Sequence, residues 1–238
     1  MGTASGVYTL RMITLPIYPV IRNLVIVLAT ILFVHIGLEL SQGVDFIGDV
    51  TLRRLFNVNG EKTFASWYAS TLLFLCALVL AAIAQVKRSK ADAYTRYWSG
   101  LAWIFVFLSL DEAASIHETL SAPVREVLNV SGFLHYAWVI PVAAVLLVLI
   151  AIYLRFYLHL PRGFKIVLAL SAVLFIGGAM GLELPGAYIA STTVERGAGY
   201  FALTTAEETL EFVGVIVFLG ALLTYLRSLA DEVKLELR

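Results

Sequence analysis

Charged residues are scarce in this chain, and their scarcity excludes most classes of soluble protein. Only 14% of the 238 residues are Asp, Glu, Lys or Arg, whereas 60% are hydrophobic. A soluble domain carries about 25% charged residues, so this chain has too few to cover a water-facing surface. Its mean hydropathy is +0.88. Because 17 bases balance 17 acids, there is no basic excess for nucleic acid, and we expect no such partner.

Cysteine and histidine are also rare. The single cysteine, Cys76, cannot form a disulfide within the chain, which excludes a disulfide-rich secreted scaffold and cysteine-based metal sites. Four histidines leave little room for a zinc site with three histidine ligands. The 11 Tyr, 14 Phe and 4 Trp exclude a disordered tail.

Long apolar segments fill most of the sequence and predict the fold. We expect an all-α, polytopic integral membrane helix bundle that forms one transmembrane domain over residues 1–238. The six predicted transmembrane helices cover residues 20–41, 64–86, 97–120, 134–157, 165–189 and 202–227.

Basic residues predict the orientation of the bundle. If the N-terminus is cytoplasmic, 12 of the 17 bases fall on the cytoplasmic side and 5 on the other. The positive-inside rule then places both termini in the cytoplasm. We expect a multi-pass protein of the bacterial inner membrane.

Acidic residues interrupt four of the six spans at a similar depth. The charge-free runs 23–38, 97–110, 166–182 and 212–226 hold only 16, 14, 17 and 15 residues, whereas a span needs about 20. Counted from the base at the other end of each run, the interrupting acid lies 15 to 18 residues away, or about 22–27 Å along a helix. The hydrocarbon core is about 30 Å thick. Four acids therefore fall in one layer, in the outer third of the membrane: Glu39, Asp111, Glu183 and Glu211.

Further polar residues are expected near this layer. In the third span, Asp111, Ser115 and Glu118 are spaced to share one helix face, and His117 is expected to point away from it. His35 and Glu39 are four residues apart on one face, a spacing that allows joint metal ligation. Glu61 precedes the second span and is within reach of the layer.

Carboxylates that crowd one layer of a membrane must hold protons, meet bases or bind a cation. Since bases are few on this side, protons or a metal are favoured, and we expect a divalent metal, either zinc or a di-iron pair. The expected ligands are His35, Glu39, Asp111, His117, Glu118, Glu183, Glu208 and Glu211. Glu112 and Glu207 are candidates for general acid–base chemistry, and Ser70 is a candidate nucleophile.

Three sequence segments carry a family resemblance. NVNGEKTFASWYAS (57–70), FLSLDEAASIHE (107–118) and EETLE (207–211) resemble those of a family of uncharacterised bacterial multi-pass membrane proteins. The resemblance implies the six-span fold and no particular reaction. The residue types of the predicted site and their place near one membrane face are also similar to those of the alkaline ceramidase-like membrane hydrolases, which gather Ser, Asp, Glu and His around zinc. This chain lacks their paired-histidine HxxxH spacing, so no residue roles are carried over.

Three functions are compatible with these patterns. The first is a metal-dependent membrane enzyme acting on a lipid or lipid-linked substrate, with membrane lipids as its surroundings. The second is a cation- or proton-coupled transporter or channel, although the cytoplasmic halves of the spans lack polar residues. The third is a non-catalytic subunit or sensor with a structural cation site.

Overall fold

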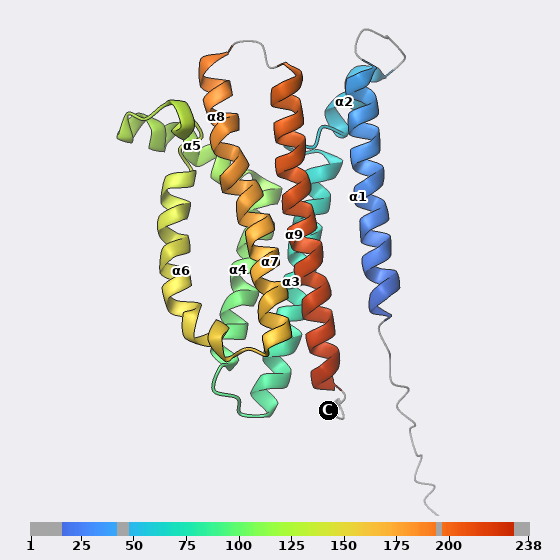
Figure 1. Cartoon of the computed structure of the whole chain (residues 1–238), viewed down its shortest axis with the longest axis vertical. Coiled ribbons are helices and arrows are strands. Elements are labelled where there is room, and N and C mark those ends of the chain that lie inside the picture. Colours follow the sequence, from blue (N-terminus) through green and yellow to red (C-terminus); the bar gives the residue numbers. More distant parts are fainter. Residues whose placement is uncertain (1–15, 42–47, 194–196, 231–238) are drawn as a thin grey trace, which may run out of the picture.

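The computed structural model describes residues 16–41, 48–193 and 197–230, and every regular element within these ranges is helical. The two chain termini, which the orientation prediction places in the cytoplasm, lie outside the described residues. Figure 1 shows the long helices running side by side along the long axis of the molecule. The described part is therefore a helix bundle, as predicted.

The long elements alternate in direction along the bundle. The long helices are α1 (Ile17–Leu40), α3 (Phe64–Ser89), α4 (Thr95–Ala114), α6 (Val139–His159) and α9 (Ala198–Ala230), and a composite helix lies between α6 and α9 in the chain. That composite runs through α7 (Arg162–Ile176), a π-helical turn η2 (Gly177–Leu182) and α8 (Glu183–Thr192). Shorter elements are α2 (Asp49–Leu55), α5 (Ile116–Leu128) and a 3₁₀ turn η1 (Gly132–Leu134).

Five of these elements are long and apolar enough to cross a membrane, and a sixth span is obtained if α4 and α5 count together. The core lies mainly where α3 packs against α4 and α9, and it is filled by apolar side chains without solvent exposure, among them Leu72, Cys76, Leu80, Ile83 and Leu222. Cys76 is thus a packing residue in the core, and the membrane fold is confirmed at the level of five to six spans.

The bundle has two chemically different ends. We call one the acidic end, because its segments carry Glu61, Asp111, Glu118, Glu183 and Glu207. We call the other the basic end, because its segments carry Lys87, Arg96, Arg155, Arg162 and Arg227. In Figure 1 the acidic end is at the top, where α5 and α8 are labelled, and the basic end is at the bottom. Acidic and basic loops, which alternate along the sequence, therefore lie at opposite ends of the bundle.

The third predicted span is wrong in its outer part. Helix α4 ends at Ala114, and Ser115 adopts a left-handed conformation (φ 54°) that turns the chain by 79° into α5. Asp111, Ser115 and Glu118 therefore do not share one helix face. His117 does not point away from Asp111 either, because the bend returns it to the end of α4, where its backbone N–H donates to Asp111 Oδ1 at 2.9 Å.

Glycine in the fifth span brings two helices into close contact at the site. A Cβ placed on Gly178 would lie 2.7 Å from the Glu207 carbonyl oxygen and 2.8 Å from Glu211 Cγ. On the facing helix, a Cβ on Gly214 would lie 2.8 Å from the Phe175 nitrogen. Of the three glycines in this π turn, Gly177, Gly178 and Gly181, only Gly178 has a neighbour within 4 Å of the added Cβ among the described residues.

We predict that Gly178→Ala lowers the free energy of unfolding by about 1–3 kcal/mol, since η2 and α9 must separate to admit the methyl group. Gly181→Ala is the matched control in the same π turn, where a Cβ has nothing within 4 Å. Thermal unfolding in detergent, followed by circular dichroism, measures the difference. Equal midpoints for the two variants would contradict the close-packing interpretation.

Candidate metal centre at the acidic end

The acidic end gathers side chains from five segments of the chain. Glu61 comes from the loop before α3, Asp111 and Glu112 from the end of α4, and His117 and Glu118 from the first turn of α5. Glu183 begins α8 directly after the π turn, and α9 supplies Glu207, Glu208 and Glu211. The bend at Ser115 and the π turn are local departures from regular helix, and π turns often occur at functional sites.

Three of these residues form a group that could hold a metal ion. Glu61, His117 and Glu118 each offer a ligand atom, and the three atoms lie within 4.8 Å of one another. Glu118 is exposed, whereas Glu61 and His117 are partly buried. Two carboxylates and one imidazole are suitable ligands for a divalent metal such as Zn²⁺, Mn²⁺ or Fe²⁺, and three protein ligands leave coordination positions for water or substrate.

Neighbouring side chains fix the orientation of two members of this group. His117 Nδ1 lies 2.8 Å from Asp111 Oδ2, which leaves Nε2 as the ring nitrogen for a metal. The Ser115 hydroxyl donates to Glu61 Oε2. A carboxylate on the far nitrogen of a ligating histidine is the usual supporting contact in metal sites. In this geometry Asp111 is a supporting residue for His117, whereas the sequence suggested that it is itself a ligand.

A chain of contacts leads from this group toward α9. The rings of His117 and Trp138 meet edge to face, with centroids 4.9 Å apart. Trp138 Nε1 donates to Glu183 Oε1 at 3.0 Å, and the Glu183 carboxyl group lies within electrostatic range of Glu207. Glu207 is only 7% exposed, and its Oε2 has no hydrogen-bond partner among the described residues. An unpartnered buried carboxyl oxygen is costly, and it points to a proton, water or ion at this place.

The remaining acids surround a small cavity beside this chain of contacts. Glu112, Glu208 and Glu211 line a cavity of about 20 Å³, together with apolar residues of α3, α7 and α9. That volume suffices for one water molecule or ion. Two carboxylates 4 Å apart repel by about 4 kcal/mol at an effective dielectric of 20. The cluster therefore needs protons or a cation to offset its charge.

Other sequence candidates lie apart from the metal group. His35 Nε2 is 3.2 Å from the Thr205 hydroxyl, and its ring packs at a tilt against Phe201 with centroids 4.8 Å apart, which places it between α1 and α9. Glu39 lies at the end of the same helix α1. Neither belongs to the group around His117. That His35 and Glu39 bind a metal stays a prediction, and their position outside the group around His117 does not favour it.

Ser70 occupies a helix-packing position. Its hydroxyl donates to the Ser109 carbonyl at 2.8 Å, and the Ser109 hydroxyl donates to the Ser70 carbonyl at 2.9 Å. This reciprocal pair joins α3 to α4 and occupies the Ser70 proton. A role for Ser70 as nucleophile has no support in this arrangement, because its hydroxyl contacts no general base among the described residues.

Two residues of the site were missed or undervalued by sequence reasoning. Glu61 was expected only to be within reach of the acidic layer, yet it is one of the three residues that could together hold a metal ion. Trp138 was not a site candidate, yet it links His117 to Glu183. The depth count does place Trp138 level with the acids, because it lies 17 residues from Arg155, the same separation as between Arg22 and Glu39, but a count of residues gives no signal of its contacts.

Comparison with known proteins gives a family and no activity. A family model described as a domain of unknown function (DUF8692) matches residues 23–226. No curated protein matches the chain, and no solved structure matches it either.

Proposed function

The chain belongs to the family of the domain of unknown function DUF8692, and from its acidic end we propose that it is a metal-dependent membrane enzyme acting on a lipid or lipid-linked substrate. The observation that carries the proposal is the convergence of Glu61, His117 and Glu118 with their ligand atoms within 4.8 Å. The hydrogen bonds from Ser115 and to Asp111 support it, since they hold two of the three side chains in place.

The residues present fit a single divalent metal. His117 Nε2 and one oxygen each of Glu61 and Glu118 would hold it, with Asp111 outside the ligand set. When bound, such a metal activates water at neutral pH and polarises a carbonyl or phosphoryl oxygen. A di-iron centre normally uses two histidines and four carboxylates, so the single histidine in this group favours one metal over two.

Carboxyl groups outside the ligand set supply acid–base chemistry. Glu112 lies next to Asp111 and is within electrostatic range of His117 and Glu61. Glu207 has an oxygen without a hydrogen-bond partner among the described residues, and it lies within electrostatic range of Glu183. A carboxyl group beside a metal can take a proton from water and return it to a leaving group. We assign this role to Glu112, because Glu61, His117 and Glu118 all act electrostatically on its carboxyl group, whereas Glu207 interacts with Glu183 and Glu208.

The surroundings of the site favour an amphiphilic substrate. Helix α5, which carries His117 and Glu118, turns 79° away from α4 and is amphipathic. It exposes Leu120, Val127 and Leu128, by 43%, 82% and 48%. A helix of this kind lies in the membrane interface with its apolar side in the lipid. A lipid head group at that depth would be level with the exposed carboxylate of Glu118.

We also propose that the basic end faces the cytoplasm of a bacterial inner membrane and that the metal site faces outward, because bases concentrate on the cytoplasmic side of membrane proteins. A fluorescent reporter fused to the C-terminus would then mature inside a bacterial host, and a periplasm-dependent phosphatase at the same position would stay inactive. The opposite pattern would reverse the orientation.

Activity on lipid is tested with purified protein reconstituted into vesicles of a bacterial polar-lipid extract. With added Zn²⁺ or Mn²⁺, we expect mass spectrometry to detect the metal-dependent loss of at least one lipid species and the appearance of its product. Glu112→Gln should abolish the conversion while metal binding persists. Metal binding without any change in the lipids would favour a structural cation site and contradict the enzyme.

A further inference from the structure

A second pocket lies at the basic end, on the opposite side of the membrane from the metal group. It has a volume of about 160 Å³ and is formed by the ends of α3, α6 and α9, the start of α4, and the short link into α7. Its lining residues are Lys87, Asp92, Tyr94, Trp98, Phe156, His159, Leu160, Pro161 and Tyr225. At about 30 Å³ for each water molecule, the space corresponds to about five waters, enough for a phosphate group with part of its ester.

The walls of the pocket are rigid aromatic rings. Trp98 stacks on Tyr225 with ring centroids 5.2 Å apart, and Tyr94 stacks on His159 at 4.5 Å. Phe156 packs edge to face against Trp98 at 5.0 Å. Tyr and Trp concentrate at the depth of lipid head groups. The pocket is therefore a preformed space at the membrane surface.

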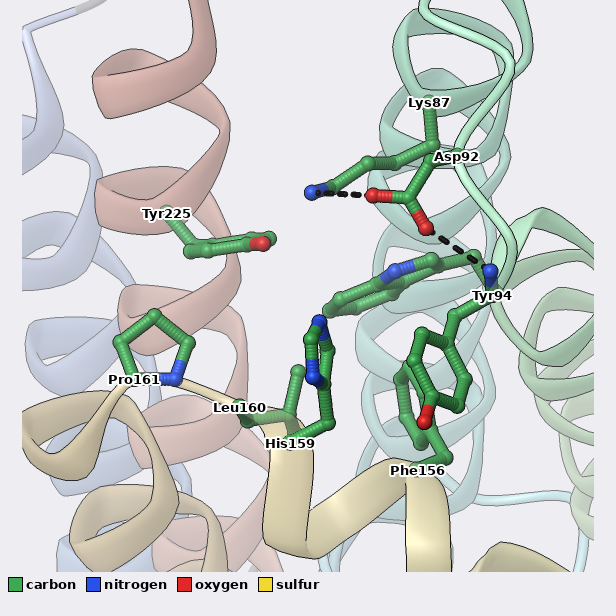
Figure 2. A pocket seen from close by; sticks show the side chains of 9 residues that line it. Lys87, Asp92, Tyr94, Phe156, His159, Leu160, Pro161 and Tyr225 are labelled. Carbon is green, nitrogen blue, oxygen red and sulfur yellow. Dashed lines mark hydrogen bonds and ion pairs between the residues drawn. The ribbon is translucent and has the colours of Figure 1, made fainter.

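Basic groups face this space. Figure 2 shows the Lys87 ammonium, the Tyr225 ring and the His159 ring pointing toward the same space between α3, α9 and the α6–α7 link. The ammonium lies 5.7 Å from the Tyr225 centroid and 3.0 Å from Asp92 Oδ2. A lysine ammonium has three N–H donors, so Asp92 orients Lys87 without using all of them.

Asp92 is fixed in turn by the chain. The Tyr94 backbone N–H donates to its Oδ1 at 2.8 Å. Partial burial acts to raise the pKa of the Asp92 carboxyl, but the Tyr94 N–H and the Lys87 ammonium prevail and hold it below its usual value. The carboxylate is thus ionised at neutral pH and keeps the Lys87 side chain at the pocket.

The surrounding charge favours an anion strongly. Among the described residues, this end carries nine bases, and Asp92 is its one acid. The bases are Arg22, Lys87, Arg88, Lys90, Arg96, Arg155, Arg162, Lys165 and Arg227. Basic pockets between transmembrane helices on the cytoplasmic side are suited to anionic lipid head groups.

We propose that this pocket binds the phosphate group of a phosphate ester, with Lys87 and His159 as its donors and Trp98, Tyr94 and Tyr225 as its walls. The chemistry is shared by an anionic phospholipid head group and by a soluble phosphate ester. Lys87 N–H and a ring N–H of His159 donate to the phosphate oxygens, and the aromatic rings exclude water from one side of the contact. The proposal does not depend on the metal group at the acidic end.

The test is native mass spectrometry of detergent-purified protein titrated with phosphatidylglycerol, phosphatidylcholine or glycerol 3-phosphate. We expect wild type to retain phosphatidylglycerol in preference to phosphatidylcholine. Lys87→Gln should weaken this binding about fivefold, the effect of one basic contact with an anionic head group. Arg88→Gln is the matched control, because Arg88 is an exposed base on the next residue and does not line the pocket.

His159→Phe keeps the proposal testable if Lys87→Gln fails to fold, since a phenyl ring can still stack on Tyr94 while the donor is lost. This variant should also bind phosphatidylglycerol more weakly. Binding of glycerol 3-phosphate without binding of the lipid identifies a soluble ester as the source of the phosphate. Wild-type affinity for phosphatidylglycerol and for glycerol 3-phosphate in a folded Lys87→Gln or His159→Phe protein would overturn the proposal.

Discussion

His117→Gln is expected to lose at least 90% of the tightly bound divalent metal of the purified protein. His117 is the one imidazole in the ligand group, and without it two carboxylates remain, of which Glu118 is exposed. Outer-shell changes alone weaken metal sites about 10- to 100-fold, so removal of a ligand should cost more. Competition with a chromophoric chelator measures the Zn²⁺ affinity of wild type and variant.

His35→Gln is the matched control for this experiment. The sequence suggested both histidines as ligands, but His35 contacts Thr205 and Phe201, away from the ligand group. A glutamine at this position retains a group that can hydrogen-bond to Thr205. We expect wild-type Zn²⁺ affinity in His35→Gln. Loss of metal in this variant, with retention in His117→Gln, would place the site between α1 and α9.

Asp111→Asn is expected to weaken metal binding about 10- to 100-fold without abolishing it. The carboxylate accepts from the His117 backbone N–H at 2.9 Å and meets the ring Nδ1 at 2.8 Å. Asparagine preserves the size of the side chain but removes its charge, so His117 loses the contact that orients it and raises its basicity. The same chelator titration yields the affinity.

Glu112→Gln serves as the comparison for Asp111→Asn, because this variant neutralises the adjacent carboxylate. Among the described residues, Glu112 makes no hydrogen bond to His117, whereas Asp111 does. We expect its metal affinity to stay within about threefold of wild type. If Asp111→Asn abolished binding as completely as His117→Gln, Asp111 would be a ligand, as the sequence suggested.

The spans and the layer of acids were accessible from the sequence because both follow from the length of charge-free runs. The predicted 64–86 and 202–227 lie inside α3 and α9. The depth count placed Glu39, Asp111, Glu183 and Glu211 in one layer. The structure puts Glu211 within electrostatic range of Glu183 and of Glu112, which is adjacent to Asp111, whereas Glu39 is not part of the group around His117. The number of residues between a base and an acid gives the depth of the acid in the membrane as long as the helix between them is straight.

The count along a straight helix could not predict that Glu61, His117 and Glu118 come together, because their proximity depends on a break in the helix. A non-glycine residue with positive φ, here Ser115, has little signal in a single sequence. A straight helix sends His117 away from Asp111, whereas the bend brings the two together. The bend likewise brings Ser115 to Glu61, a residue from a loop whose path no periodic pattern describes.

Anomalous X-ray diffraction from crystals grown with Zn²⁺ or Mn²⁺ would locate a bound metal directly. We expect one strong peak at the metal edge, among the side chains of Glu61, His117 and Glu118 and next to His117 Nε2. A peak confined to the cavity of Glu112, Glu208 and Glu211, or no peak at the acidic end of fully metal-loaded crystals, would contradict it.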